Sequence, residues 1–314
     1  MSEIPDPVNH TVDRIYDALA QRAKGGDSAG VPMSDAINPC DRAIWYAFRW
    51  ASPPETPNGP RESRFATGEA WETRLLDDLQ AIGCDVERVD PATGKQRSAV
   101  LADGYLRGKL DGLVRGVPEA PAALHVVEAR SLKAEKWRGV VKHGVQKHIP
   151  EHFAQCQLYM SALGVDRCLY LCVNKDTDER HAERLYADPA FASAIEARIV
   201  RIVNCAEPPS RLHDDPAAKA AWQCGLCRHR AICHEKAFAR VNCRTCLHST
   251  VWTPWKCDKL NLLMTWDSQQ AGCEHHRYIP ALVPGEQIDV IYGDCIVYQM
   301  EDGDHWIDGE RQAA

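Results

Sequence analysis

The stretch of residues 104–130, GYLRGKLDGLVRGVPEAPAALHVVEAR, holds two short apolar runs that each carry one acidic residue. The first run, residues 106–114, passes through Asp111 into a connection rich in Gly, Pro and Ala, and the second run, residues 124–127, is a short β-branched segment. This pattern predicts a β-hairpin with a loose loop. Such a hairpin places Asp111 and Glu128 close together on adjacent strands.

Two interpretations of these neighbouring acids are open. Carboxylates on adjacent strands repel each other unless a cation lies between them, and a divalent metal with oxygen ligands is the usual solution. A metal held in this way lowers the pKa of a bound water and stabilises a phosphoryl transition state. The alternative is that both acids are solvated residues at the ends of loops, and the hairpin alone is compatible with either.

Length and composition indicate a globular protein with one main domain and an appendage, because 314 residues with 45% hydrophobic content can bury a sizeable core. No apolar run approaches membrane-spanning length. Residues 1–10 have no apolar signal core, so we expect a cytoplasmic protein. In that compartment fourteen cysteines indicate metal sites rather than disulfides.

The formal net charge of -7 excludes a protein coated in positive charge, so any contact with nucleic acid depends on a local patch. Residues 130–148 form one such patch, and residues 228–244 form a second. The basic residues of the first patch are Arg130, Lys133, Lys136, Arg138, Lys142 and Lys147. A charge run is most often only a solvated face, so neither patch by itself predicts a nucleic-acid site.

Helices are expected on both sides of the hairpin. Residues 65–82 have apolar residues at helical spacing, with Thr67 as the expected N-cap, Gly83 as the stop and Glu72 within the first two turns. A short helix is also expected over residues 12–23, and another carries Cys40, Arg42 and Trp45.

The chain after the hairpin predicts further alternation of helices and strands. Pro150 opens a helix on which Gln155 and Tyr159 lie one turn apart on the same face. Strands follow over residues 168–173 and 180–186, and then a helix over 189–203. With a strand near Val86, this order predicts an α/β fold with a mixed sheet.

Seven of the cysteines lie within the fifty residues that begin at Cys224, and they divide into two sets. The later set predicts a tetrahedral zinc site in which all four ligands are thiolates, Cys243, Cys246, Cys257 and Cys273. Such a site would hold a small domain that otherwise lacks a core. The histidines that could replace one of these ligands are His248, His275 and His276.

The earlier set, Cys224, Cys227 and Cys233, has no fourth ligand nearby, and the best-placed candidate is Cys40, far away in sequence. Four thiolates of this kind suit either an iron-sulfur cluster or a second zinc ion. Spacing alone does not choose between these two metals.

Taken together, these motifs resemble the iron-sulfur nucleases of the PD-(D/E)XK superfamily, which include the CRISPR-associated exonucleases and the RecB-like nuclease domain of AddB. GEAWE resembles the helical motif of that superfamily, GKLDG the first catalytic Asp, VVEAR the Glu-x-Lys strand and QCQLYM the Gln and Tyr helix. Cys40 and CGLCRHRAIC resemble the cluster ligands. The resemblance covers residues ~35–235, about two thirds of the chain, and it is nearest to phage-encoded exonucleases.

The resemblance implies a restriction-endonuclease-like mixed sheet flanked by helices. The implied domains are an N-terminal helix and linker (residues 1–35), a nuclease domain (36–235) and a Cys-rich, β-rich zinc-binding domain (236–314). It also implies a [4Fe-4S] cluster that joins the two ends of the nuclease core through Cys40, Cys224, Cys227 and Cys233.

The resemblance further implies that Asp111 and Glu128 bind Mg or Mn and that Glu72 replaces a histidine found in many relatives. Gln155 and Tyr159 would orient DNA or the catalytic lysine. The residues expected to contact DNA are Arg42, Lys136, Arg138 and Lys142.

One position departs from the family pattern. The lysine expected two residues after Glu128 is Arg130, which stays charged and binds phosphate as a fork. Lys133 could reach in from the next turn, Lys109 could substitute from the neighbouring strand, or the enzyme could be weakened. The sequence leaves all three open.

The leading hypothesis is a hydrolase, a Mg- or Mn-dependent deoxyribonuclease that acts as an exonuclease rather than an endonuclease in phage or bacterial recombination. The alternative is an accessory protein that keeps the fold and binds DNA but has lost turnover through Arg130. Expected partners are single-stranded DNA or duplex ends and, from the phage relatives, a single-strand annealing protein in the cytoplasm of a bacterial host. No membrane is expected.

Overall fold

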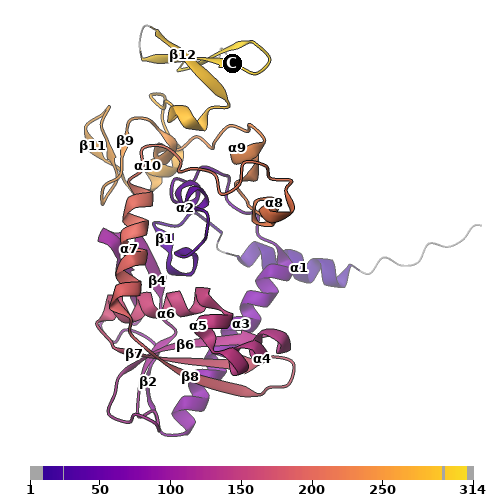
Figure 1. Cartoon of the computed structure of the whole chain (residues 1–314), viewed down its shortest axis with the longest axis vertical. Coiled ribbons are helices and arrows are strands. Elements are labelled where there is room, and N and C mark those ends of the chain that lie inside the picture. The colour runs from indigo at the N-terminus through magenta and orange to yellow at the C-terminus, as the bar shows by residue number, and fades with distance from the viewer. Residues whose placement is uncertain (1–9, 24, 292–293, 310–314) are drawn as a thin grey trace, which may run out of the picture. The chain divides into compact units, whose positions relative to one another are not determined.

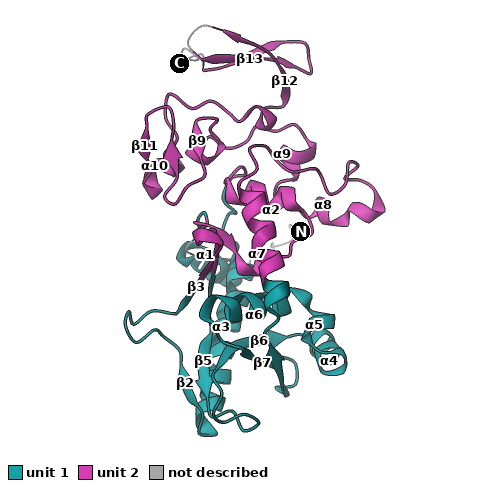
Figure 2. Cartoon of the chain, turned by 60° about the vertical axis from the view of Figure 1, so that its left-hand side comes forward, with its two compact units in different colours: residues 1–27, 54–99, 108–192 teal, residues 28–53, 100–107, 193–314 magenta. Residues whose placement is uncertain are grey.

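The computed structural model describes residues 10–23, 25–291 and 294–309, and the chain forms two compact units (Figure 2). The first unit is built from residues 1–27, 54–99 and 108–192, and the second from 28–53, 100–107 and 193–314. Both units are therefore discontinuous in sequence, whereas the expected boundaries at residues 35 and 235 are linear. Parts of the expected terminal segments, residues 1–9, 24 and 310–314, lie outside the described residues.

The first unit contains a five-stranded mixed sheet of order β2-β5-β6-β7-β8 (Figure 1). Its strands are β2 (Asp85–Glu87), β5 (Gly112–Arg115), β6 (His125–Leu132), β7 (Arg167–Asn174) and β8 (Arg180–Tyr186). Strands β6 and β7 run parallel, and the other neighbours are antiparallel. The prediction of a mixed α/β sheet is confirmed.

The expected hairpin is present as β5 and β6, with Gly112 opposite Val127. Its first run is nevertheless not one strand, because β4 (Leu106–Lys109) belongs to a different sheet. The chain changes sheets between the two strands, where Leu110 donates its backbone N–H to Arg97 at 3.0 Å. Asp111 is therefore held at a break between strands rather than within a ladder.

Helix α3 (Gly59–Ala81) is the long helix that carries Glu72. It begins well before the expected N-cap, because Asn58 accepts a hydrogen bond from the N–H of Arg61 at 3.1 Å. The prediction that Thr67 caps this helix is wrong, since the Thr67 hydroxyl donates to the Ser63 carbonyl inside the helix. Gly83, with φ of 91°, ends the helix as predicted.

The remaining helices of the first unit pack on this sheet or on neighbouring helices. Their bounds are α1 (Thr11–Arg22), α4 (Ala134–His143), α5 (Val145–His148) and α6 (Pro150–Leu163), while α7 (Pro189–Val203) begins in this unit and continues into the second. Helices α3 and α6 both contact β6. Because side chains alternate along a strand, Val127 and Ala129 join the core beneath α3, whereas Glu128 and Arg130 point to the other face, where α6 lies.

The second unit consists of short elements around a buried arginine. Its helices are α2 (Asp41–Phe48), α8 (Trp222–Gly225), α9 (Arg230–His234) and α10 (Trp266–Ala271). Arg244 lies at its centre, with its guanidinium 3.7 Å from the ring centroid of Trp50 and donating to the Phe48 carbonyl at 2.9 Å. This cation–π stacking holds the guanidinium among the buried aromatic side chains of the unit, which include Phe48 and Trp255.

Three small sheets complete the fold, with strand orders β1-β4-β3, β11-β10-β9 and β12-β13-β14. Their strands are β1 (Val31–Pro32), β3 (Ser98–Leu101), β9 (Ser249–Thr250), β10 (Lys256–Cys257), β11 (Leu262–Leu263), β12 (Gly285–Ile291), β13 (Cys295–Met300) and β14 (His305–Asp308). Across the described ranges, no helix combines the length and apolarity that a membrane span requires.

Candidate active site

Asp111 is the best-anchored acid of the predicted site. It is 7% exposed, and its Oδ2 accepts a hydrogen bond from the backbone N–H of Ala129 at 2.8 Å. This bond ties the break between β4 and β5 to the neighbouring strand β6. Burial raises the pKa of the Asp111 carboxyl, against the lowering effect of Arg130 and of this hydrogen bond.

Glu128 lies next to that anchor and is fully buried. Within the described part of the chain neither of its carboxylate oxygens accepts a hydrogen bond. The negative charge of the carboxylate is balanced there by an ion pair between Oε1 and Arg130. Burial raises the pKa of Glu128 to about 8, and Asp111 and Glu72 act in the same direction while Arg130 opposes them. A buried carboxylate with spare oxygens is a position that favours a bound cation.

Glu72, on α3, completes the set of acids. Burial, followed by the charge of Asp111, raises the pKa of Glu72 to about 7. Glu72 and Asp111 line one pocket of about 350 Å³. The other residues of this pocket are Glu69, Thr73, Leu76, Arg88 and Gln96.

Five residues of this pocket were not predicted as site residues, namely Glu69, Thr73, Leu76, Arg88 and Gln96. Glu69 precedes Glu72 by three positions on the same helix, so helical spacing could have placed it beside the site. Arg88 and Gln96 lie outside the motifs, and no local pattern distinguishes them from ordinary surface residues.

Arg130 lies among the acids. Its Nη1 is 3.5 Å from Asp111 Oδ2 and donates to the Ala129 carbonyl at 3.1 Å, while Nη2 pairs with Glu128. Burial alone would lower the pKa of Arg130, but the charges of Glu128 and Asp111 together raise it above its ordinary value. The guanidinium is therefore permanently charged and already pairs with two of the three carboxylates.

Gln155 and Tyr159 hold Arg130 from helix α6, and they face the site one turn apart as predicted. Gln155 Oε1 accepts from Arg130 Nη2 at 3.4 Å, and Gln155 Nε2 donates to the Tyr159 hydroxyl at 2.7 Å. The Tyr159 hydroxyl in turn donates to the Lys109 carbonyl at 2.7 Å. This chain of hydrogen bonds fixes the guanidinium relative to the strand that leads into Asp111.

The two lysines considered as substitutes lie elsewhere. Lys133 is an exposed residue at the N-terminus of α4, and the Lys109 side chain is also exposed. Among the described residues, neither lysine forms an ion pair with Glu72, Asp111 or Glu128. The cation that the structure brings to the acids is Arg130.

The residues expected to contact DNA fall in two places. Lys136, Arg138 and Lys142 are exposed on α4, which follows β6 directly and contacts it. Arg42 belongs to the second unit, where it donates to the Tyr46 hydroxyl and the Pro209 carbonyl, each at 2.9 Å. Arg42 lines the cysteine cavity described next.

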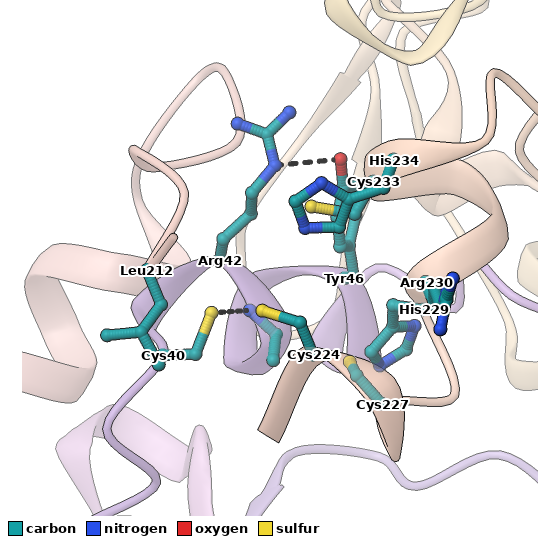
Figure 3. A pocket seen from close by; sticks show the side chains of 11 residues that line it. Cys40, Arg42, Tyr46, Leu212, Cys224, Cys227, His229, Arg230, Cys233 and His234 are labelled. Carbon is teal, nitrogen blue, oxygen red and sulfur yellow. Dashed lines mark hydrogen bonds between the residues drawn. The ribbon is translucent and has the colours of Figure 1, made fainter. Parts of the chain in front are cut away.

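The first cysteine set surrounds one cavity in the second unit, as Figure 3 shows, and its members are Cys40, Cys224, Cys227 and Cys233. Cys40 caps α2, with its sulfur accepting from the Ala43 N–H at 3.4 Å. Burial raises the pKa of Cys224 and Cys227, and nearby thiols of the set contribute to both shifts. Four thiols around a single cavity are a donor set that suits an iron-sulfur cluster or zinc.

The second cysteine set lies further along the same unit. Burial raises the pKa of Cys243 to about 11, and Cys273, Cys246 and Cys257 all add to this effect. These four cysteines are therefore near enough to interact electrostatically. In the described ranges, however, no group of three or more His, Cys, Asp or Glu side chains is arranged to hold a metal ion as it stands.

Neither a protein-family profile nor a curated protein matches this chain. Among solved structures, it is similar to LHK-Exo, an alkaline exonuclease from Laribacter hongkongensis, with 16% identity and a TM-score of 0.39 over 61% of this chain and 90% of that one. A complex of LHK-Exo with dAMP gives 15% identity and a TM-score of 0.38 over 62% and 91% of the two chains. The structure of SSO0001 gives 13% identity and a TM-score of 0.40 over 72% and 97%.

Proposed function

We propose that this chain is a nuclease that hydrolyses DNA with Mg or Mn held by Glu72, Asp111 and Glu128. The observation that carries the proposal is a set of three acids from α3, the β4–β5 break and β6, in which burial and the charge of Asp111 raise the pKa of both glutamates. Two of the acids, Glu72 and Asp111, share a pocket, and the third, Glu128, is fully buried and accepts no hydrogen bond from the residues that the structure describes. Perturbed carboxyl pKa values in a pocket are typical of functional sites. The order of the motifs along the chain supports phosphodiester chemistry in particular.

The chain's own residues supply distinct parts of this reaction. A bound metal would lower the pKa of the attacking water and offset charge on the phosphate. Glu72 and Asp111 share a pocket, so both would hold this metal, and the proton of the attacking water would pass to solvent. As the water oxygen bonds to phosphorus, the phosphorus–oxygen bond to the leaving nucleotide breaks, and the leaving oxygen takes a proton from solvent.

Arg130 would contact the phosphate rather than deprotonate the water. A guanidinium does not lose its proton near neutral pH, but it binds two phosphate oxygens at once. Gln155 and Tyr159 keep it in place through the hydrogen bonds described above. The exposed basic residues of α4 would guide the strand through sequence-independent, salt-sensitive contacts.

We further propose exonuclease rather than endonuclease action, a [4Fe-4S] cluster on Cys40, Cys224, Cys227 and Cys233, and zinc on the second cysteine set. These finer assignments rest on the family resemblance and on the thiol donor sets. A role in recombination and a single-strand annealing partner rest on the resemblance alone.

One observation favours a second candidate function, a DNA-binding accessory protein without turnover. Arg130 already pairs with Glu128 and lies beside Asp111, so a metal must share these carboxylates with a resident cation. A site that keeps its acids neutralised in this way would bind metal weakly.

The test is to purify the protein anaerobically, measure iron and labile sulfide, and incubate it with linear single- and double-stranded DNA in Mg or Mn. We expect degradation that disappears in Glu128→Gln and persists in Glu135→Gln, a matched change at an exposed position of α4. Absence of degradation in either metal, with DNA binding intact, would instead support the accessory protein.

A further inference from the structure

The acidic pocket contains an arginine that the proposed chemistry does not use. Arg88 follows β2 and lines the same pocket as Glu72 and Asp111. One end of its guanidinium is held by α3, where Nη2 donates to Asp77 at 2.5 Å and to Gln80 at 2.6 Å. Within the described part of the chain its Nε and Nη1 donate no hydrogen bond, so they are available to a ligand in the pocket.

The glutamine and the acids of this pocket do not provide a free donor for an anionic ligand. Gln96 Nε2 is used in a 2.9 Å hydrogen bond to the Leu110 carbonyl, which positions the residue before Asp111. Glu69, Glu72 and Asp111 would repel an anion unless a metal offset their charge. Arg88 is therefore the cationic side chain with donors to spare among the residues that line this pocket.

The size and chemistry of the pocket indicate the ligand. A volume of about 350 Å³ can hold a phosphate group together with part of its sugar. A guanidinium N–H donates a charge-assisted hydrogen bond to a phosphate oxygen, and Arg88 can donate from Nε or from Nη1. We propose that Arg88 binds a phosphate of the nucleic-acid strand beside the one that is cleaved, and this inference rests on the proposed function.

Asp77 would compete with the phosphate for the guanidinium of Arg88, and this competition gives a second test. Its side chain is 61% exposed, so the ion pair can open towards solvent. Asp77→Asn should therefore release Arg88 and strengthen binding of the strand. If Arg88 and Asp77 only fastened β2 to α3, the same change would leave binding unchanged or weaken it.

A matched control is the ion pair between Arg180, on β8, and Asp78, which lies on α3 next to Asp77. Arg180 pairs with Asp78 at 2.6 Å and is exposed to a similar extent as Arg88, with 35% against 29% of its side chain accessible. Arg180 does not line the acidic pocket. Arg180→Gln and Asp78→Asn thus remove an equivalent ion pair without touching the pocket.

The experiment measures binding of a labelled single-stranded oligonucleotide across a salt series, with Ca²⁺ in place of Mg so that the strand is not cleaved. For Arg88→Gln we expect affinity to fall about tenfold and the slope of log K against log salt to shrink by roughly 0.7, the value for one lost phosphate contact on a single strand. Arg180→Gln should leave both unchanged, and Asp77→Asn should raise affinity while Asp78→Asn does not.

Equal effects of Arg88→Gln and Arg180→Gln, or an unaltered salt slope in Arg88→Gln, would overturn the inference. If Arg88→Gln does not fold, Asp77→Asn decides, because unchanged or weaker binding in that variant contradicts a phosphate site. Oligonucleotides with and without a 5′-phosphate identify whether the bound group is a terminal monoester or an internal diester. Failure of the proposed function looks different, because no variant would then cleave DNA in Mg or Mn while the salt slopes still differed.

Discussion

The guanidinium of Arg130 pairs with the carboxylate of Glu128, two residues earlier on the same strand. Side chains two positions apart on a strand share a face, so β6 itself brings acid and cation together. The buried acid is thereby stabilised in the absence of metal. The same contact sets a competition, since any metal must share Glu128 with Arg130.

Arg130→Lys tests that competition. The more compact ammonium has no planar fork to pair with Glu128 and Asp111 together, so more carboxylate surface becomes available to a metal. We expect Mn to bind about tenfold more tightly and DNA cleavage to accelerate, measured by calorimetry and by release of labelled nucleotides. Arg115→Lys, at an exposed position of β5, should change neither. Weaker metal binding in Arg130→Lys would mean that the guanidinium supports the metal rather than opposing it.

Metal affinity should rise with pH. The pKa of Glu72 is raised to about 7 and that of Glu128 to about 8, so both acids release protons when a cation binds. Calorimetry in Mg or Mn should therefore show affinity increasing from pH 6 to pH 9. In Glu72→Gln the lower part of this increase should be lost. A flat profile in the unaltered protein would contradict the burial of these acids.

Stability of the metal-free protein should fall over the same range. A carboxyl whose pKa is raised on folding holds its proton more tightly in the folded state, so its contribution is present at low pH and is lost as pH rises through the folded pKa. For Glu128, whose folded pKa is about 8, this amounts to about 3 kcal/mol between pH 6 and pH 9. Urea unfolding should show this decline, and saturating Mn should remove most of it. Glu128→Gln, which does not titrate, should show a smaller decline.

Tyr159→Phe should destabilise the first unit. The hydroxyl bridges Gln155 Nε2 and the Lys109 carbonyl, and its removal leaves the buried Gln155 amide and this carbonyl without that partner. We expect a loss of about 1–3 kcal/mol in the free energy of unfolding by urea. Tyr186→Phe, at a position that is 59% exposed, provides the control and should have little effect. An unchanged free energy of unfolding in Tyr159→Phe would show that water replaces the hydroxyl.

The two cysteine sets should lose metal independently. Cys40→Ala removes one of four thiols around the first cavity, so iron and labile sulfide, or zinc if that is the resident metal, should fall. Cys243→Ala should lower zinc without affecting the first set. Cys84→Ala, in the other unit, should retain all metal. Elemental analysis of each purified variant measures the outcome, and full metal content in Cys40→Ala would exclude it as a ligand.

Much of the sheet could be predicted from the sequence, because strong local signals mark it. The strand over residues 180–186 and the helix over 189–203 match the predicted bounds, and Gly83 ends α3 as its position suggested. The start of α3 was missed because its cap, Asn58, lies in a proline-rich segment that reads as loop.

Other features have no local signature. The break at Asp111 depends on a backbone hydrogen bond from Leu110 to Arg97 in a different segment, and the pocket position of Arg88 depends on partners on α3. Within the candidate site, the three acids and the pair Gln155 and Tyr159 on α6 were predicted, because the sequence motifs contain them. The ion pairs of Arg130 were not predicted. The pair with Glu128 follows from their spacing of two residues on one strand, whereas the contact with Asp111 depends on the break between β4 and β5.

The discontinuous units have a consequence for synthesis on the ribosome. Helix α2, with Trp45, Tyr46 and Phe48 destined for burial, belongs with residues 193–314. At ~5–20 residues per second, Cys40 is made roughly 10–40 s before Cys224. During that interval the nascent chain exposes aromatic side chains whose partners do not yet exist. Chaperones that shield such segments should therefore matter more for this protein than its length suggests.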